Sequence, residues 1–231
     1  MKGIVRFSSV FFVIILGHVH ASSDLLPLSR NDMAIVRAVL SDSAISNIIS
    51  AWEIKELGRT IVMSDQTTAC ELPESEEENY RVELYMEGIA HGDDILASEL
   101  KSPTPTPGKD IVVGKGKVIP GEVVDACLET KDQKRRVAPP DISGPLAVVL
   151  ESHEFMEKHF RSEDPNPWQA RHANAVGALN VSSPAYSRDG KVAGIYMVRL
   201  RTGLGGAGVF YFLENTGSSW AIRWWETVFI E

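Results

Sequence analysis

His153 and Glu157 are the residues of this chain whose types and spacing come nearest to a known catalytic pattern. In zinc proteases two histidines four residues apart on a helix bind the metal, and an intervening glutamate acts as the base. Here Glu157 stands at the second histidine position, and His159 lies about 240° around the helix from His153 and cannot share its face. We interpret the pair mainly as an exposed charged helix face. It remains the candidate catalytic pair of a hydrolase, with no metal or other cofactor predicted.

The two cysteines, Cys70 and Cys127, are the next candidates for chemistry. An even cysteine count in an exported chain favours a disulfide, which here would join residues 57 positions apart. Two alternatives stay open. The cysteines could be inert buried thiols, or one could be a nucleophile assisted by a histidine, although it would have to stay reduced in an oxidising compartment. We predict the disulfide.

Two further groups of residues are candidates for binding. Residues 65–68 are polar and follow a predicted strand, where they could line a site; we favour a turn whose side chains satisfy backbone groups. Trp224 and Trp225 are adjacent in a predicted strand and cannot both face inward, so we expect one at the surface. We predict that binding involves Trp225 and the tip of a glycine-rich hairpin loop, at Gly203, Leu204 and Gly206.

The first 21 residues have the order of a signal peptide. Lys2 and Arg6 give a positive start, residues 7–17 are uncharged, and the small side chains of Val19 and Ala21 precede the predicted cleavage after Ala21. A retained membrane anchor is the alternative, but a spanning helix needs about 20 apolar residues and this run has about half as many. We expect a periplasmic or secreted chain with no stable membrane insertion after cleavage.

The charge balance argues against a nucleic-acid partner. Loss of Lys2 and Arg6 leaves 21 basic residues against 31 acidic ones, a net charge of −10. Nucleic-acid binding depends on clustered Lys and Arg that neutralise phosphates. The basic cluster here, Lys131 with residues 134–136, is short and followed by two prolines. We interpret it as a solvated loop.

Hydrophobic periodicity predicts the elements that position these residues. A helix begins near residue 31, capped by Asn31 or Asp32 and interrupted at residues 41–43, and a second short helical stretch follows up to residue 52. Further short helices are predicted at 153–161 and 168–175. Predicted strands are 59–63, a hairpin over 110–119, a buried strand at 146–150, and an antiparallel meander of 192–200, 209–213 and 220–230. Residues 220, 222, 224, 228 and 230 are expected on one face of the last strand.

These elements predict an α+β fold in which a few short helices pack against an antiparallel C-terminal β-meander. We expect a single globular domain over residues 22–231. A proline-rich segment at about 102–108 favours an extended, exposed connector. The fold of residues 71–135 is left open.

The C-terminal third carries an ordered set of motif residues. They are Ser187-x-Asp189-Gly190-Lys191-x-Ala193, Tyr196, Gly203-Leu204-x-Gly206-x-Gly208 and Gly217-x-x-Trp220. This order resembles a group of uncharacterised exported bacterial proteins without an assigned activity, which implies export and the fold of residues 141–231 but no function. In several of those proteins the glycine-rich turn reads Cys-Gly-x-Leu-Cys-Gly. The corresponding positions here are Arg201 or its neighbour and Gly205, so no thiol pair is carried over.

The acidic composition, the surplus tryptophan and the lack of a complete catalytic motif favour binding over catalysis. We expect an accessory or inhibitor domain of the cell envelope whose partner is another envelope or secreted protein. One alternative is an envelope hydrolase, with or without a metal, that uses His153 and Glu157 or the polar cluster at residues 65–68. Another is a structural domain whose sheet contributes to an assembly.

Overall fold

A computed structural model describes residues 25–41, 49, 60–75, 105–140, 147–160, 166–200 and 205–230. Its helices are α1 (Arg30–Val39), the short 3-10 helix η2 (Gly114–Gly116), α5 (Gly121–Thr130), α6 (His153–Phe160) and α7 (Asn166–Arg171). Its strands are β1 (Thr60–Ser64), β2 (Ile111–Val113), β3 (Lys117–Ile119), β4 (Ala147–Glu151), β5 (Ala175–Val181), β6 (Ala185–Tyr186), β7 (Val192–Leu200), β8 (Gly206–Asn215) and β9 (Trp220–Ile230). The predicted signal peptide and second helical stretch lie outside the described residues, apart from Ile49. Among the described helices, none has the length and apolar character needed to cross a membrane.

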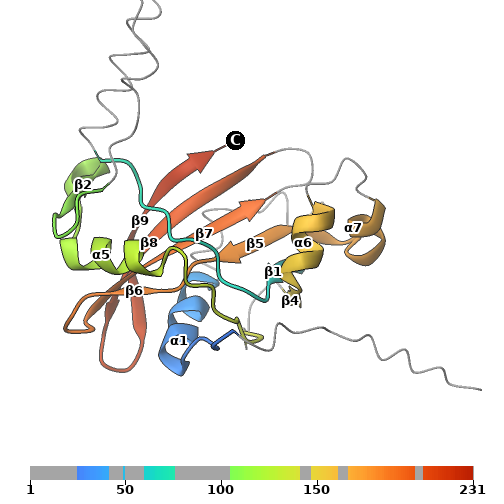
Figure 1. Ribbon diagram of the computed structural model, residues 1–231, viewed down its shortest axis with the longest axis horizontal. Coiled ribbons are helices and arrows are strands. Elements are labelled where there is room, and N and C mark those ends of the chain that lie inside the picture. Colours follow the sequence, from blue (N-terminus) through green and yellow to red (C-terminus); the bar gives the residue numbers. More distant parts are fainter. Residues whose placement is uncertain are drawn as a thin grey trace, which may run out of the picture.

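The predicted α+β fold is confirmed, with a mixed sheet at its centre (Figure 1). The strand order is β4-β1-β5-β7-β8-β9, with β6 beside β7. The predicted antiparallel meander forms β7, β8 and β9. The sequence did not predict that β4, β1 and β5 would pair in parallel.

The predicted helix at 168–175 is too long, because β5 already begins at its end. The last turn of α7 closes with the bond from His172 N to Trp168 O, and a turn from Ala175 N to His172 O follows. Gly177 then has φ 148°, and a Cβ there would lie 2.6 Å from the backbone oxygen of Leu200. At this point within β5, the close approach of two strands requires glycine.

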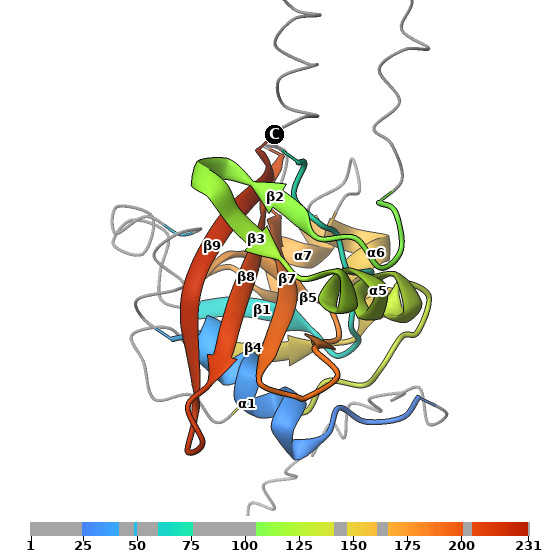
Figure 2. The same cartoon turned by 90° about the vertical axis from the view of Figure 1, so that its left-hand side faces the viewer.

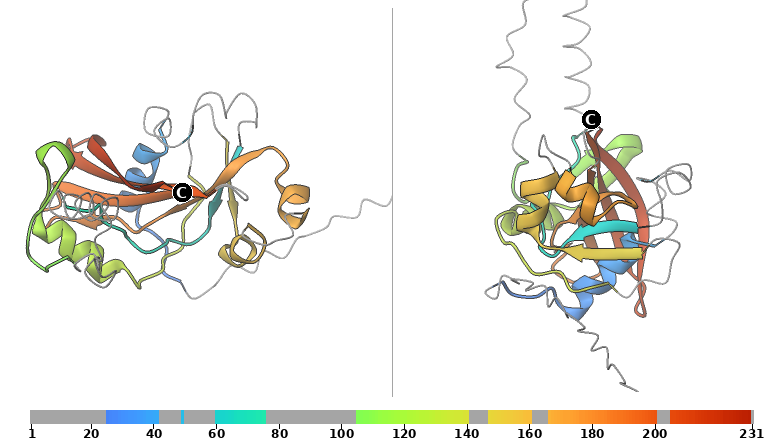
Figure 3. Two further views of the ribbon diagram at one scale, coloured as in Figure 1. Left: turned by 90° about the horizontal axis from the view of Figure 1, so that it is seen from above. Right: turned by 90° about the vertical axis from the view of Figure 1, so that its right-hand side faces the viewer.

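Helices cover both faces of the sheet (Figure 3). On one face, α1 packs against inward residues of β7 and β8, among them Ile195, Met197 and Tyr211. On the other face, α5 and the β2–β3 hairpin cover Tyr196, Val198, Phe210 and Phe212, and α6 and α7 cover Val62 and Ala178. Because successive side chains of a strand point to opposite faces of the sheet, the core forms two layers, one on each face. Most of the apolar stabilisation comes from this burial.

The N-cap of helix α1 lies two to three residues before the predicted cap at Asn31 or Asp32. Ser29 is the N-cap, and the Ser29 and Asp32 side chains each accept a hydrogen bond from the other's backbone N–H. Such a capping box satisfies two amides that the helix leaves unpaired. Asp32 also accepts a hydrogen bond of 2.7 Å from the hydroxyl of Tyr186. Burial, followed by this bond, raises the pKa of Tyr186 well above its ordinary value.

Two of the strand predictions need correction. The predicted buried strand at 146–150 is β4, the edge strand of the sheet, and its Val149 is 42% exposed. Register shifts on β9 interrupt its alternation, so its apolar residues do not share one face. Trp220 and Ile222 face the α1 side, whereas Trp224 and Val228 face the α5 side.

The predicted solvated loop at residues 131–136 is only partly correct. Lys131 and Lys134 are exposed, but the backbone of Arg135 and Arg136 is bonded on both sides. Leu28 N donates to Arg136 O, and Thr67 N donates to Arg135 O. The segment thus joins the chain before α1 to the chain after β1. Charge pattern alone misses this, because the bonds are made by the backbone.

Of the predicted proline-rich connector, residues 105–108 are described. Gly108 N donates to the carboxylate of Asp125 on α5, so this end of the connector is held against the fold. Helix α5 lies in the part of the chain whose fold the sequence left open. Its buried face, with Val123, Val124 and Cys127, packs on the sheet.

Candidate functional site

The parallel strands β1, β4 and β5 bring their carboxyl ends to one edge of the sheet. Strand β1 lies between β4 and β5. Beyond its end, Asp65 N donates to Glu151 O on one side and Thr68 N donates to Val181 O on the other. Polar residues end or follow each strand: residues 64–68 at the end of β1, 151–153 at the end of β4, and 182–183 after β5.

Residues 65–68 do not form the predicted turn but an extended segment with bridges at Gln66 and Thr68, and two of their side chains accept hydrogen bonds from distant backbone amides. The carboxylate of Asp65 accepts from His153 N at 2.9 Å, and the hydroxyl of Thr67 accepts from Arg135 N at 2.9 Å. Thr67 is fully buried. These bonds fix the start of α6 and the end of β1 relative to one another.

His153 and Glu157 meet as predicted, and Ser64 and Lys134 join them. His153 Nε2 lies 3.2 Å from the Glu157 carboxylate and 3.2 Å from the Lys134 ammonium. His153 Nδ1 lies 3.5 Å from the hydroxyl of Ser64. Ser64 is almost fully buried and also accepts a hydrogen bond from Gln66 N. Both imidazole nitrogens therefore face protein groups, and the hydroxyl is shielded from solvent.

These contacts do not favour a metal at His153. The Lys134 ammonium lies beside Nε2, where a metal ion would bind, and its charge would repel a cation. Within the described part of the chain, no three His, Cys, Asp or Glu side chains gather closely enough to hold a metal ion.

A cavity of about 390 Å³ lies beside this cluster, between α6, the sheet and the segment that follows β1. That segment, residues 65–75, runs over the sheet face from β1 toward α5 (Figure 1). The lining residues are Thr68, Glu71, His153, Met156, Glu157, Phe160, Asn180, Tyr196, Val198, Leu200 and Phe229. Met156, Phe160 and Val198 are buried, whereas Glu71 and Glu157 are exposed. The cavity is thus lined by both apolar and polar side chains, and its two carboxylates are exposed to solvent.

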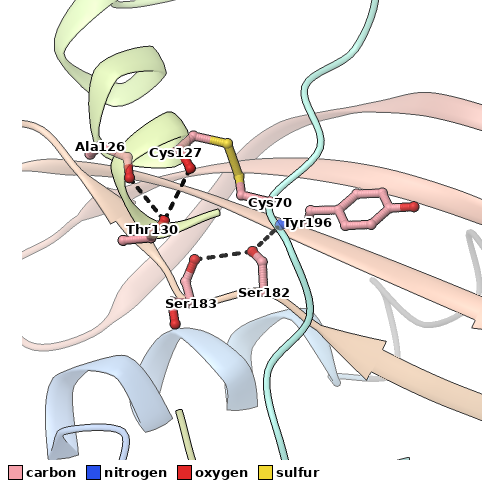
Figure 4. Close-up of a disulfide and its surroundings, with 7 residues drawn as sticks. All are labelled: Cys70, Ala126, Cys127, Thr130, Ser182, Ser183 and Tyr196. Atoms are coloured by element: carbon pink, nitrogen blue, oxygen red, sulfur yellow. Dashed lines mark hydrogen bonds between the residues drawn. A yellow bond between two sulfur atoms is a disulfide. The ribbon is translucent and has the colours of Figure 1, made fainter. Parts of the chain in front are cut away.

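The predicted disulfide between Cys70 and Cys127 is confirmed, and it holds one wall of the cavity (Figure 4). The free-thiol alternatives are therefore wrong. Cys70 stands between the lining residues Thr68 and Glu71, and Cys127 belongs to α5. Both cysteines pack in the same apolar cluster as Tyr196, another lining residue. The covalent bond therefore fixes the segment after β1 against α5.

Asn180 is a lining residue that the sequence did not reveal. It lies on β5, the strand that was partly mistaken for a helix. Its side-chain oxygen is buried and has no hydrogen-bond partner among the described residues. Buried polar atoms in proteins are nearly always paired with protein or water. The oxygen is closed off from solvent, so other atoms of Asn180 form its part of the cavity lining.

Glu151, at the carboxyl end of β4, forms a second cluster next to the cavity. Its carboxylate accepts from Ser152 N at 2.9 Å and lies 2.8 Å from Arg171 Nε and 3.0 Å from His172 Nε2. Glu151 is buried, and the side chain of His172 is 8% exposed. Because Arg171 and His172 lie at the end of α7, this cluster fixes that helix against the sheet.

Trp225 is the exposed member of the tryptophan pair. Its side chain is 40% exposed, whereas Trp224 stacks on Phe212 with ring centroids 5.0 Å apart. The β2–β3 hairpin lies beside β9 (Figure 2), and Lys117 Nζ donates to the backbone oxygen of Trp225 at 2.8 Å. The predicted loop residues Gly203 and Leu204 lie outside the described residues, and Gly206 is buried where β8 begins.

The chain was compared with protein-family models, with curated proteins and with solved structures. No match was found in any of the three comparisons. A functional assignment therefore depends on the cavity and its lining residues.

Proposed function

We propose that this protein is an extracytoplasmic binding protein that takes a small ligand in the cavity beside α6. The cavity itself carries the proposal. Its volume of about 390 Å³ falls within the roughly 300–1,000 Å³ of typical ligand pockets. Such pockets are mostly apolar and have a few placed polar groups, and this one combines buried Met156 and Val198 with Asn180 and His153. The disulfide supports an oxidising compartment, in agreement with the predicted signal peptide.

The contacts of His153 support binding better than hydrolysis. A serine hydrolase needs a hydroxyl that reaches the substrate, but Ser64 is buried and is not among the residues that line the cavity. A general base must reach the proton that it removes, and both nitrogens of His153 already face Ser64, Lys134 and Glu157. The Glu157 side chain is 72% exposed, as is typical of a surface carboxylate without a catalytic role.

Filling the cavity tests this function. We expect Val198→Trp, which extends a bulky side chain from β7 into the cavity, to abolish ligand binding. Val149→Trp is the matched control, because the same change is made on an exposed edge-strand residue. Saturation-transfer NMR with a mixture of small cationic, anionic and neutral apolar compounds measures binding. We expect the native protein and Val149→Trp to bind one or more of these compounds, and Val198→Trp to bind none. Equal binding by all three proteins would place the ligand elsewhere.

Exposed Trp225 favours a second candidate function, recognition of another envelope protein. It lies on β9, which is an edge strand of the sheet, and exposed edge strands are common sites of association. Tryptophan is enriched among residues that dominate binding, where truncation costs about 2 kcal/mol or more.

For a partner that binds at Trp225, Trp225→Ala should weaken binding about 30-fold without changing the unfolding midpoint. Leu26→Ala is the control, because Leu26 is an exposed apolar residue outside the strands of the sheet. Pull-down from the native envelope identifies the partner, and titration of that purified partner measures affinity. Unfolding of Trp225→Ala, or equal affinities for both variants, would rule out this surface.

A further inference from the structure

We infer that the β2–β3 hairpin shields the outer edge of β9 from pairing with the same strand of a second copy of this protein. Lys117 is the residue responsible, because its ammonium group caps that edge. The inference is independent of the cavity and its ligand. It concerns the backbone of β9, whereas the second candidate function concerns the side chain of Trp225.

Trp225 and Thr227 direct their backbone groups to the outer edge of β9. Among the described strands, only β8 pairs with β9. Thr216 N donates to Ser219 O and closes the turn between the two strands. Every second residue of an antiparallel pair bonds to the neighbouring strand, so the even-numbered residues of β8 bond β9, and one of them pairs with Glu226. The residues on either side of Glu226 therefore turn their N–H and C=O groups away from β8, where they form a template for another strand.

Lys117 occupies this edge at Trp225. Its Nζ donates to Trp225 O at 2.8 Å and to the carboxylate of Glu226 at 2.8 Å. The same ammonium lies 5.7 Å from the centre of the Trp224 ring, whose face attracts a cation. A strand that added to β9 here would have to displace the ammonium and break its charge-assisted hydrogen bonds. A lysine on an edge strand is a common means of preventing such pairing.

The hairpin holds Lys117 in this position beside β9 (Figure 2). Val113 and Ile119, which end β2 and β3, are fully buried in the apolar cluster on the α5 face. Gly114 lies against Glu226, because a Cβ at this position would be 3.3 Å from the carboxylate oxygen. A larger side chain would crowd this contact. The cap is therefore anchored on the core at one end and on β9 at the other.

The strand that this edge would accept is β9 of a second copy. Eight of the eleven residues of β9 are β-branched or aromatic, the types that are most frequent in strands. Segments of this composition pair readily with copies of themselves where their edge is exposed. An antiparallel pairing centred on Trp225 keeps every side chain on its own face and places the two Trp225 residues opposite one another, a favourable cross-strand pair. The Lys117 ammonium lies at the centre of this pairing and opposes it.

Removing the ammonium group tests the shield. Lys117→Met keeps the apolar stem of the side chain and loses its charge. We expect this variant to self-associate about ten-fold or more tightly than the native protein, measured by sedimentation velocity over a series of protein concentrations. Lys191→Met is the matched control, because Lys191 also pairs with a carboxylate, that of Asp189, but lies outside β9 and the hairpin. It should leave self-association unchanged.

A second change at the same edge locates the contact between copies. Thr227→Pro removes an N–H that points away from β8, so it blocks strand addition without breaking the bonds to β8. Combined with Lys117→Met, it should return self-association to the native level. Thr227→Lys adds a charge at the same edge without altering the backbone and should act in the same way, which covers a proline variant that fails to fold. Circular dichroism and the unfolding midpoint check the fold of each variant.

Three results would overturn the inference. Unchanged self-association of a folded Lys117→Met variant would show that the ammonium does not shield the edge. An equal increase in Lys191→Met would attribute the effect to the loss of any positive charge. Self-association of Lys117→Met that persists in both Thr227 variants would place the contact between copies away from the β9 edge. None of these results bears on the cavity, so the small-ligand function is tested separately.

Discussion

Replacing both Cys70 and Cys127 with alanine is expected to lower the free energy of unfolding by about 4 kcal/mol. The disulfide joins residues 57 positions apart, and in the chain-entropy model a cross-link of that span restricts the unfolded chain by about this amount. Both cysteines are buried in the apolar cluster on the α5 face, so the two truncations add a smaller loss of packing.

The same change should weaken ligand binding in the fraction that remains folded. Thr68 and Glu71 flank Cys70 and line the cavity, and the disulfide is the covalent link between their segment and α5. Without it, binding must order this wall, which costs conformational entropy. We expect the affinity for a cavity ligand to fall together with stability.

Urea unfolding followed by tryptophan fluorescence measures the stability loss. Reductant should destabilise the native protein and leave the double-alanine variant unaffected, which provides the internal control. A loss of unfolding free energy below about 1 kcal/mol would contradict the entropic model. It would mean that the unfolded chain is already compact in this region.

Glu151→Ala should destabilise the protein by about 3 kcal/mol, the second largest effect that we expect. Glu151 is a buried carboxylate bonded to Ser152 N, Arg171 and His172. Removing one member of a buried pair leaves the other desolvated and without its partner, and His172 is buried here. The pair with Arg171 should contribute less, because the Arg171 side chain is 55% exposed.

Thermal and urea unfolding separates these contributions in Glu151→Ala, in the control Glu154→Ala, and in His172→Ala and Arg171→Ala, each alone and combined with Glu151→Ala. Glu154→Ala, three residues away and exposed on α6, should change stability by less than about 0.5 kcal/mol. A double-mutant cycle should give a larger coupling energy for Glu151 with His172 than for Glu151 with Arg171. Equal effects of Glu151→Ala and Glu154→Ala would show that the cluster does not hold α7 in place.

The success of the sequence predictions depended on how local each signal was. Helix α6 begins at His153 as predicted, because Ser152 caps it through a bond to Phe155 N. Strands β7 and β9 have the predicted bounds, since their apolar residues and bounding turns are contiguous in sequence. The cap of α1 was misplaced by a few residues, because Ser29, Asn31 and Asp32 are all favourable caps and only the folded backbone selects Ser29.

The candidate site was predictable only in part. His153 and Glu157 are one helical turn apart, so their contact follows from local geometry. Lys134 and Ser64 lie 19 and 89 residues from His153, and no periodic pattern joins them. Asn180 gave no signal of its own, because an asparagine within an apolar run indicates neither a strand nor a pocket.

The sequence by itself determined the C-terminal meander, helix α6, the cysteine pairing and the surface position of one of two adjacent tryptophans. Each follows from backbone sterics, a period of 2.0 or 3.6 residues, or a choice among very few partners. Tertiary structure alone decided the parallel β4-β1-β5 arrangement, the edge position of β4 and the cavity. These depend on how distant segments jointly bury their apolar faces, a property of the whole folded chain that no short stretch of residues encodes.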